Sequence, residues 1–196
     1  MRNRWYSDNR DLVKWSILIH LARMTAATRI LQIAYFRHDT FAGIEIDGEP
    51  FEIPSEIKTH FRDIHRIKDI SSPLKISVFD MVLENRKDYL DQATKFITSF
   101  ADEKCIVFLD PDTGLEPVHP NLNHILEEEI ERCWSILKAG DVLVFYQHQT
   151  NRNGTSWMEP KRSQIERALK AHEGAVKIAH GLKLAHDVAF FYVRKA

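Results

Sequence analysis

The residue types best suited to chemistry lie in the run V-F-L-D-P-D-T-G-L-E at residues 107–116. Asp110 and Asp112 follow an apolar stretch that is typical of a buried strand, Pro111 stiffens the backbone between them, and Gly114 permits a tight turn. Two carboxylates at a strand tip can hold a substrate amine, or they can bind a divalent cation such as Mg²⁺ or Mn²⁺. Because ordinary strand-exit turns use the same residue types, a structural role stays open as well.

A second candidate site is the run Y-Q-H-Q-T-N-R at residues 146–152, which follows the apolar residues 142–145. His148 can serve as a general base, a metal ligand or a reader of base edges, although a lone histidine at a strand end is often structural. The neighbouring side chains that can form hydrogen bonds are the candidates for substrate binding: Tyr146, Gln147, Gln149 and Arg152.

A third candidate lies near the N-terminus, in the run N-R-D-L-V-K at residues 9–14. Asp11 and Lys14 are three residues apart, so a helix places them on one face, with Asn9 just before them. The simplest interpretation of this spacing is a surface ion pair that contributes about a few tenths of a kcal/mol.

Composition excludes several classes of protein. With 44% hydrophobic and 28% charged residues, the chain resembles a globular domain, and no apolar stretch is long enough for a membrane span. No apolar segment follows the basic N-terminus, so we expect no secretory signal. Cys105 and Cys133 lie on apolar faces, which predicts free buried thiols in a reducing cytoplasm and no thiolate zinc site. The net charge of −1 by itself predicts no polyanion partner.

Helical and strand patterns alternate along the chain. They predict helices over residues 8–24, 54–67, 85–100, 121–137 and 159–171, and strands over residues 28–36, 74–79, 104–109, 141–146, 175–179 and 188–193. The inward face of the first helix is predicted from Leu12, Trp15, Ile19 and Ala22. A hairpin around Asp47-Gly48 is expected within residues 37–53.

Alternation of this kind predicts an α/β fold, a Rossmann-like three-layer sandwich with a mostly parallel sheet and an antiparallel C-terminal strand pair. We expect a single domain over residues 1–196 with a hairpin insertion near residues 40–53. In such folds, ligands bind beyond the carboxyl ends of the strands. That rule selects residues 37–39, Asp80, and the two polar runs after the strands at 104–109 and 141–146.

Several of these motifs resemble class I methyltransferases. The run L-K-A-G-D at residues 137–141 looks like their L-K-P-G-G entry into the fifth strand, and D-P-D-T at 110–113 occupies the place of the D-P-P-Y loop of nucleic-acid amino-methyltransferases. The run at residues 9–14 is similar to the N-x-A-D-V-L-K segment of the ribosomal RNA adenine-N6 methyltransferases. This resemblance implies an S-adenosylmethionine cofactor beside Asn9, Asp11, Lys14 and Asp80.

The same resemblance implies that Asp110 holds the target amine, while His148 and Arg152 position the substrate. The chain departs from the pattern in two places. No G-x-G follows the strand at residues 28–36, and Asp112 and Thr113 replace the second proline and the aromatic residue of D-P-P-Y. Stacking on a flipped base would therefore need another residue, such as Tyr146.

A closer resemblance, which spans most of the chain, is to a group of small uncharacterised bacterial and phage proteins. These proteins pair F-x-D-P-D-N-G-[LI]-E with Y-Q-H and carry D-x-x-K-[WY] near the N-terminus. The matching residues here are F-L-D-P-D-T-G-L-E at 108–116, Y-Q-H at 146–148 and D-L-V-K-W at 11–15. The resemblance brings no assigned activity with it.

Three hypotheses follow. The leading one is a methyltransferase-like enzyme that acts on nucleic acid or a nucleotide. The second is a nuclease or other hydrolase in which Asp110 and Asp112 bind Mg²⁺ or Mn²⁺ and His148 activates water. The third is a non-catalytic binding module on the same fold. The fold alone does not choose among them, and the oligomeric state cannot be predicted.

Overall fold

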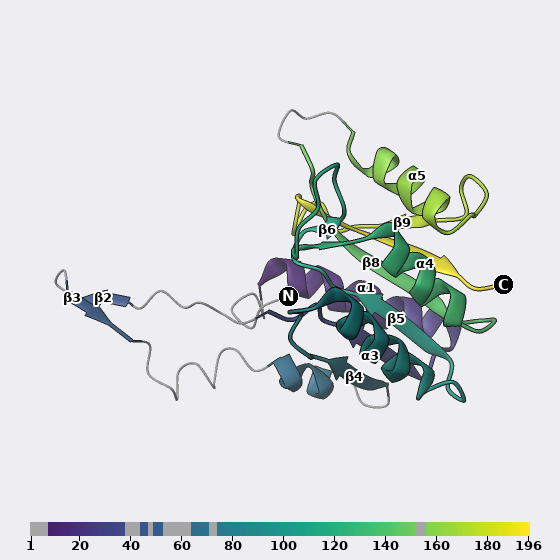
Figure 1. The fold of residues 1–196 in the computed structure, drawn as a ribbon, viewed down its shortest axis with the longest axis horizontal. Helices are drawn as coiled ribbons and strands as arrows, with labels where there is room; N and C mark the ends of the chain where they lie inside the picture. The colour runs from purple at the N-terminus through teal and green to yellow at the C-terminus, as the bar shows by residue number, and fades with distance from the viewer. Residues whose placement is uncertain (1–7, 38–43, 47–48, 53–63, 71–73, 152–155) are drawn as a thin grey trace.

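Six strands form one sheet in the order β4-β1-β5-β8-β10-β9 (Figure 1). The computed structural model describes residues 8–37, 44–46, 49–52, 64–70, 74–151 and 156–196. The strands of this sheet are β1 (Arg29–Ile33), β4 (Lys75–Phe79), β5 (Cys105–Leu109), β8 (Val142–His148), β9 (Lys177–Ala179) and β10 (Val188–Arg194). The first four in spatial order are parallel, whereas β10 runs antiparallel to both of its neighbours. The predicted α/β class and its antiparallel ending are confirmed.

The strands are apolar because helices cover both faces of the sheet. One face packs against α1 (Asn9–Thr25) and the 3-10 helix η2 (Ile64–Ile70), and the other packs against α3 (Arg86–Thr98), α4 (Glu127–Ile136) and α5 (Met158–Ala168). In Figure 1, α3 and α4 lie in front of the sheet and α1 lies behind it. Alternate residues of β5 divide between the two cores: Val107 and Leu109 face α3 and α4, whereas Ile106 and Phe108 face α1.

Helix α1 begins where the sequence predicts, since the Asp8 carboxylate accepts hydrogen bonds from the backbone N–H groups of the first turn. Its predicted inward face is partly wrong. Leu12 is 55% exposed, whereas Lys14 is buried together with Trp15 and Leu18. Hydrophobic periodicity could not find this rotation of the helix, because a buried lysine breaks the apolar pattern.

Helix α4 begins at Glu127, six residues later than predicted, because the residues before it form a turn and a short strand. The short strand β7 (His124–Ile125) pairs in parallel with β6 (Gly114–Leu115), so this segment holds the loop after β5. The Glu129 carboxylate then accepts a hydrogen bond from the Leu126 N–H at 2.9 Å and fixes the start of the helix.

The long connection between β1 and β4 is described only in part. Strands β2 (Ile44–Ile46) and β3 (Glu49–Phe51) form a separate antiparallel pair. Most of the helix predicted over residues 54–67 lies outside the described residues, and its last residues belong to η2, a 3-10 helix. Among the helices described, none combines the length and apolar character that a membrane crossing requires.

Candidate functional site

The strand order reverses at β1, which places a ligand-binding position at the carboxyl ends of β1 and β5. The chain passes from β1 to β4 on one side and then crosses back to β5 on the other. In open α/β sheets, ligands bind in the crevice outside such a switch point. Asp110 lies there, since its backbone N–H extends the β1–β5 pairing and donates to the Ile33 carbonyl at 3.0 Å.

The Asp110 carboxylate is only 2% exposed and is held by two buried donors. Lys14 Nζ lies 3.1 Å from Oδ2, and Gln32 Nε2 donates to the same oxygen at 2.7 Å. Within the described part of the chain, no donor reaches the other oxygen, Oδ1. Two described side chains therefore fix one oxygen of Asp110, Oδ2.

Lys14 joins Asp110 to a second carboxylate. Its ammonium lies 2.9 Å from Asp11 Oδ1 and 5.2 Å from the centre of the Tyr146 ring. Burial works to lower the pKa of Lys14, but Asp110 and Asp11 outweigh it and raise the pKa well above its usual range. Burial raises the pKa of Asp110, and Lys14 opposes that shift. One buried ammonium thus joins two carboxylates, from α1 and from the end of β5.

The predicted residues Tyr146 and His148 lie beside this cluster. The Tyr146 hydroxyl and His148 Nε2 are 2.8 Å apart, and the two rings meet edge to face. Burial and the nearby Arg10 lower the pKa of His148, so the imidazole is neutral near pH 7. Tyr146 is buried and packs against Phe190, so stacking on a flipped base would require its ring to become accessible.

Three residues that sequence reasoning missed complete the site. Gln32 is fully buried in β1, and its signal was a lone polar residue in an apolar strand. Arg10 forms a two-pronged ion pair with Asp187, with Nη2–Oδ2 at 2.5 Å and Nε–Oδ1 at 3.2 Å. Since β10 is antiparallel, Asp187 at its start lies at the same edge as the ends of β5 and β8, and His148 Nδ1 is 3.9 Å away from it.

The predicted substrate-binding residue Gln147 points to the opposite face and holds the loop after β5. Its Oε1 accepts a hydrogen bond from the Leu115 N–H at 2.8 Å, and its Nε2 donates to the carbonyls of Thr113 and His148. Lys161 donates from α5 to the carbonyls of Leu115 and Glu116. The side-chain amide of Gln147 is thus engaged within the protein.

The other predicted residues do not join the cluster. Asp112 is paired with Arg37, whose Nε lies 3.7 Å from Oδ2. Asn9 is exposed in the first turn of α1, and Gln149 is half-buried, with its backbone N–H bonded to the Asp187 carbonyl. Asp80 directly follows β4 and is half-buried, and Arg152 lies outside the described residues.

The carboxylates of Asp110 and Asp112 are poorly arranged for binding a metal ion. Among the residues that the structure describes, no group of three or more His, Cys, Asp or Glu side chains could hold an ion. Asp110 already shares Oδ2 with the Lys14 ammonium, and Asp112 is paired with a guanidinium. The hypothesis of a Mg²⁺ or Mn²⁺ site on these two aspartates therefore has no third ligand among the described residues.

The turn after β1 differs from a glycine-rich phosphate loop. Tyr35 occupies it with φ +47°, is 2% exposed, and donates its backbone N–H to the Tyr89 hydroxyl at 2.7 Å. A bulky buried side chain at this point keeps a ligand from approaching the backbone as closely as glycine allows. A ligand at the switch point must therefore use side chains such as Asp110 in place of a backbone cradle.

Comparison with known proteins finds a distant similarity of fold. No family model matches the chain, and no curated protein matches it. Among solved structures, a DUF574 family protein from Streptomyces avermitilis aligns with a TM-score of 0.46 and 8% identity, over 96% of this chain and 82% of that chain. A likeness this distant carries no information about the activity or the site.

Proposed function

We propose that this protein is a methyltransferase-like enzyme that acts on an amino group of a nucleotide or nucleic acid, with S-adenosylmethionine as the methyl donor. The observation that carries the proposal is the convergence of Asp11 and Lys14 with Asp110. These residues belong to two motifs that separately resemble methyltransferases, and 96 positions separate Lys14 from Asp110. They meet at the switch point, where α/β sheets bind their ligands.

The residues present fit parts of the cofactor. Asp80 follows β4, the parallel neighbour of β1, and an acidic residue at this tip holds ribose hydroxyls in dinucleotide-binding folds. A sulfonium beside this cluster would lie near the carboxylates of Asp11 and Asp110, whose negative charge attracts a cation. The turn at Tyr35 does not fit a backbone contact, so carboxylate side chains would recognise the cofactor.

Side chains of this protein could orient the target amine and accept the proton that it loses. S-adenosylmethionine supplies an electrophilic methyl group when bound. Asp110 Oδ1 would accept a hydrogen bond from the target amine, while Lys14 and Gln32 hold Oδ2 and fix the orientation of the carboxylate. Neutral His148 can take up the proton that the amine nitrogen loses as its new bond to carbon forms.

Transfer of a radiolabelled methyl group tests this proposal. Wild-type protein would be incubated with S-adenosylmethionine and, separately, single-stranded RNA, single-stranded DNA and nucleoside monophosphates. We expect label in at least one acceptor and a loss of about a hundredfold or more in Asp110→Asn. Asp102→Asn is the matched control, because Asp102 is exposed just before β5, at the opposite edge of the sheet. No transfer to any acceptor, or equal transfer by Asp110→Asn, would contradict the proposal.

A further inference from the structure

A pocket of about 700 Å³ lies where the parallel strands begin, at the edge of the sheet opposite to Asp110. It is lined by residues just before β5, just before β8 and at the end of β10. Its described lining contains one acidic side chain and four basic ones, which are Lys104, Lys138, Arg194 and Lys195. We call this hollow the basic pocket.

Two of the four cations are held in place by the protein. Lys138 Nζ lies 3.0 Å from Asp141 Oδ1, so its charge is compensated. Lys195 Nζ donates to the Trp134 carbonyl at 2.9 Å and lies 4.2 Å from the centre of the Trp134 ring. Neither contact of Lys195 involves a carboxylate, so its ammonium is positioned but its charge remains available to an anion.

The other two cations, Lys104 and Arg194, form no ion pair with any residue that the structure describes. Arg194 is exposed at the end of β10. The stem of Lys104 lies across Gly140, where a Cβ would come within 3.2 Å of Lys104 Cε. Because cations that are gathered without counterions repel one another, an anion bound among them is favoured.

Basic residues continue along the same edge of the sheet. Lys75 begins β4 and Lys177 begins β9, and both are exposed. These are the two outer strands, and neighbouring strands lie about 4.8 Å apart, so the edge extends over about 24 Å. A row of this length is longer than a single phosphate group needs.

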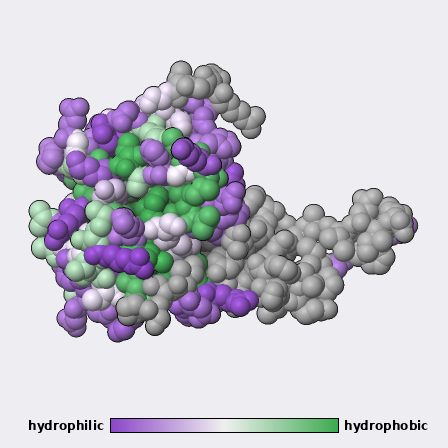
Figure 2. All heavy atoms as spheres, turned by 180° about the vertical axis from the view of Figure 1, so that it is seen from behind, coloured by the Kyte–Doolittle hydropathy of each residue, from purple (hydrophilic) through white to green (hydrophobic). Residues whose placement is uncertain are grey.

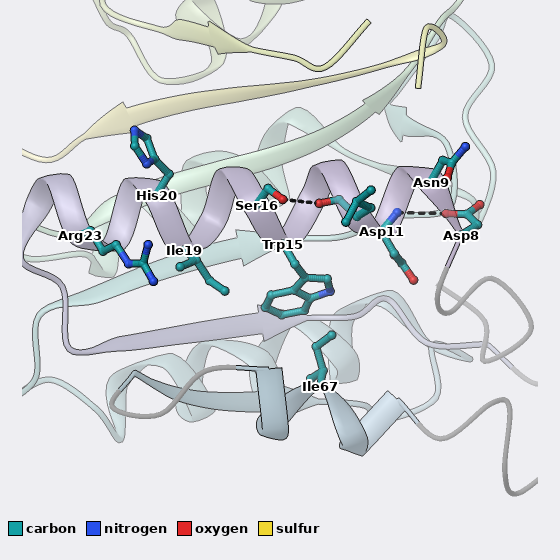
Figure 3. Close-up of a pocket in the computed structure, with 10 residues that line it drawn as sticks. Asp8, Asn9, Asp11, Trp15, Ser16, Ile19, His20, Arg23 and Ile67 are labelled. Carbon is teal, nitrogen blue, oxygen red and sulfur yellow. Dashed lines mark hydrogen bonds between the residues drawn. The ribbon is translucent and has the colours of Figure 1, made fainter. Parts of the chain in front are cut away.

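The opposite edge carries acidic residues, among them Asp110 and Asp187. Helix α1 follows the same division, since Figure 3 shows Asp8 near its start and Arg23 near its other end. In Figure 2 the edge with the basic pocket lies on the left, and the most apolar surface lies nearer the middle of the molecule. A chain with a net charge of −1 thus has a separate positive region.

We infer that the basic pocket binds the phosphodiester backbone of a nucleic acid strand. Lys104, Arg194 and Lys195 would contact its phosphates, and the guanidinium of Arg194 suits a two-pronged contact. No aromatic or large apolar side chain occurs in the described lining. The backbone would therefore be bound without reading the bases, and the pocket offers no side chain for insertion into a lipid surface.

The inference does not rest on methyl transfer, because Asp110 lies at the other edge of the sheet. A strand held here is a polymer, so the pocket favours nucleic acid over a free nucleotide as the partner. Binding can be measured without S-adenosylmethionine, and Asp110→Asn should lose methyl transfer but retain this binding.

Fluorescence anisotropy of a labelled oligouridylate of about 20 nucleotides, titrated with the full chain between about 50 and 200 mM salt, tests the inference. Three phosphate contacts predict a slope of about −2 for log K against log salt. In Lys104→Gln/Arg194→Gln, one contact remains, so we expect a slope of about −0.7 and binding about tenfold weaker at low salt. An unchanged thermal unfolding midpoint would show that this variant is folded.

Lys87→Gln/Arg167→Gln is the matched control. It removes the same charge from exposed positions on α3 and α5 that do not line the pocket, and it should bind RNA as wild type does. Asp102→Asn, which removes the carboxylate from the pocket, should bind RNA no more weakly than wild type.

Several results would overturn the inference. These are no RNA binding at low salt, equal affinity in Lys104→Gln/Arg194→Gln and wild type, or an equal loss in the control variant. Inorganic tripolyphosphate that binds as tightly as RNA would indicate a site for a small anion. Binding to phosphatidylserine vesicles in place of RNA would indicate a membrane surface. Loss of RNA binding in Asp110→Asn would place the strand at the other edge.

Discussion

The two faces of the sheet's carboxyl edge use buried polar groups differently. On the α1 face, Lys14 and Gln32 contact another side chain, the Asp110 carboxylate. On the opposite face, Gln147 and Lys161 contact the backbone of the loop after β5. A side chain that holds another side chain can leave one of its atoms to a ligand, whereas a side chain bonded to backbone fixes the shape of a loop. We therefore propose that the first face carries the function and that the second stabilises the loop after β5.

Strand β8 produces this division within three residues. Successive side chains of a strand point to opposite faces, so Tyr146 and His148 lie beside Lys14 while Gln147 lies beside Gly114. A run of three polar residues in a sequence looks like one site. In the folded protein it contributes to two regions with different roles.

The largest expected effect is that of Lys14→Met. Removal of the ammonium would leave Asp11 and Asp110 buried without their shared counterion, which typically costs about 3–5 kcal/mol in the free energy of unfolding. Urea denaturation would measure this loss. The double variant Lys14→Met/Asp110→Asn should recover part of it, because one uncompensated charge is removed. Wild-type stability in the single variant would show that the cluster is not a buried ion pair.

A second prediction compares two glycines with positive φ. In Gly114→Ala, the new Cβ would lie 2.5 Å from the Gln147 side chain at φ +117°, so both strain and collision oppose it. We expect a loss of about 2–4 kcal/mol. Gly174→Ala has φ +78° but no atom within 4 Å, so only the backbone strain of about 1 kcal/mol remains. Equal thermal unfolding midpoints for the two variants would contradict the role of Gln147 in supporting the loop.

Lys161→Met tests whether α5 stabilises the loop after β5. The substitution removes hydrogen bonds to the carbonyls of Leu115 and Glu116, at 3.2 and 3.1 Å, and should cost about 1–3 kcal/mol. Amide hydrogen exchange should rise in residues 110–116 and remain unchanged at Lys14 and the rest of α1. If exchange rose equally in α1, the two faces would not be separate units.

The smallest effect is a dependence on pH through His148. Its pKa is lowered in the folded protein by burial and by Arg10, so below about pH 6.5 the unfolded chain binds a proton that the folded protein binds less readily. Stability should therefore fall as pH decreases through this window. Comparison of urea midpoints at pH 7.5 and 5.5 should show a smaller decrease in His148→Gln than in wild type. An equal decrease would place His148 in a solvent-like environment.

The order of strands and helices could be predicted from the sequence more fully than the contacts of the polar side chains. Apolar strands and helical periodicity are local signals, so the element order placed Asp110, Tyr146 and His148 at the carboxyl ends of their strands, where the structure has them. The start of α4 was missed because β7 pairs with a segment that local pattern does not identify. The Arg10–Asp187 pair joins residues 177 positions apart, and its formation depends on the antiparallel direction of β10.

The most direct test of the functional face is a calorimetric titration with S-adenosylmethionine. We predict binding to the wild-type protein, and binding at least tenfold weaker to Asp11→Asn, because this change removes a carboxylate beside Lys14 that would attract the sulfonium. Lys161→Met, on the supporting face, should retain the cofactor affinity. The absence of heat at high protein concentration, or an equal affinity in Asp11→Asn and wild type, would contradict our assignment of the buried cluster as a cofactor site.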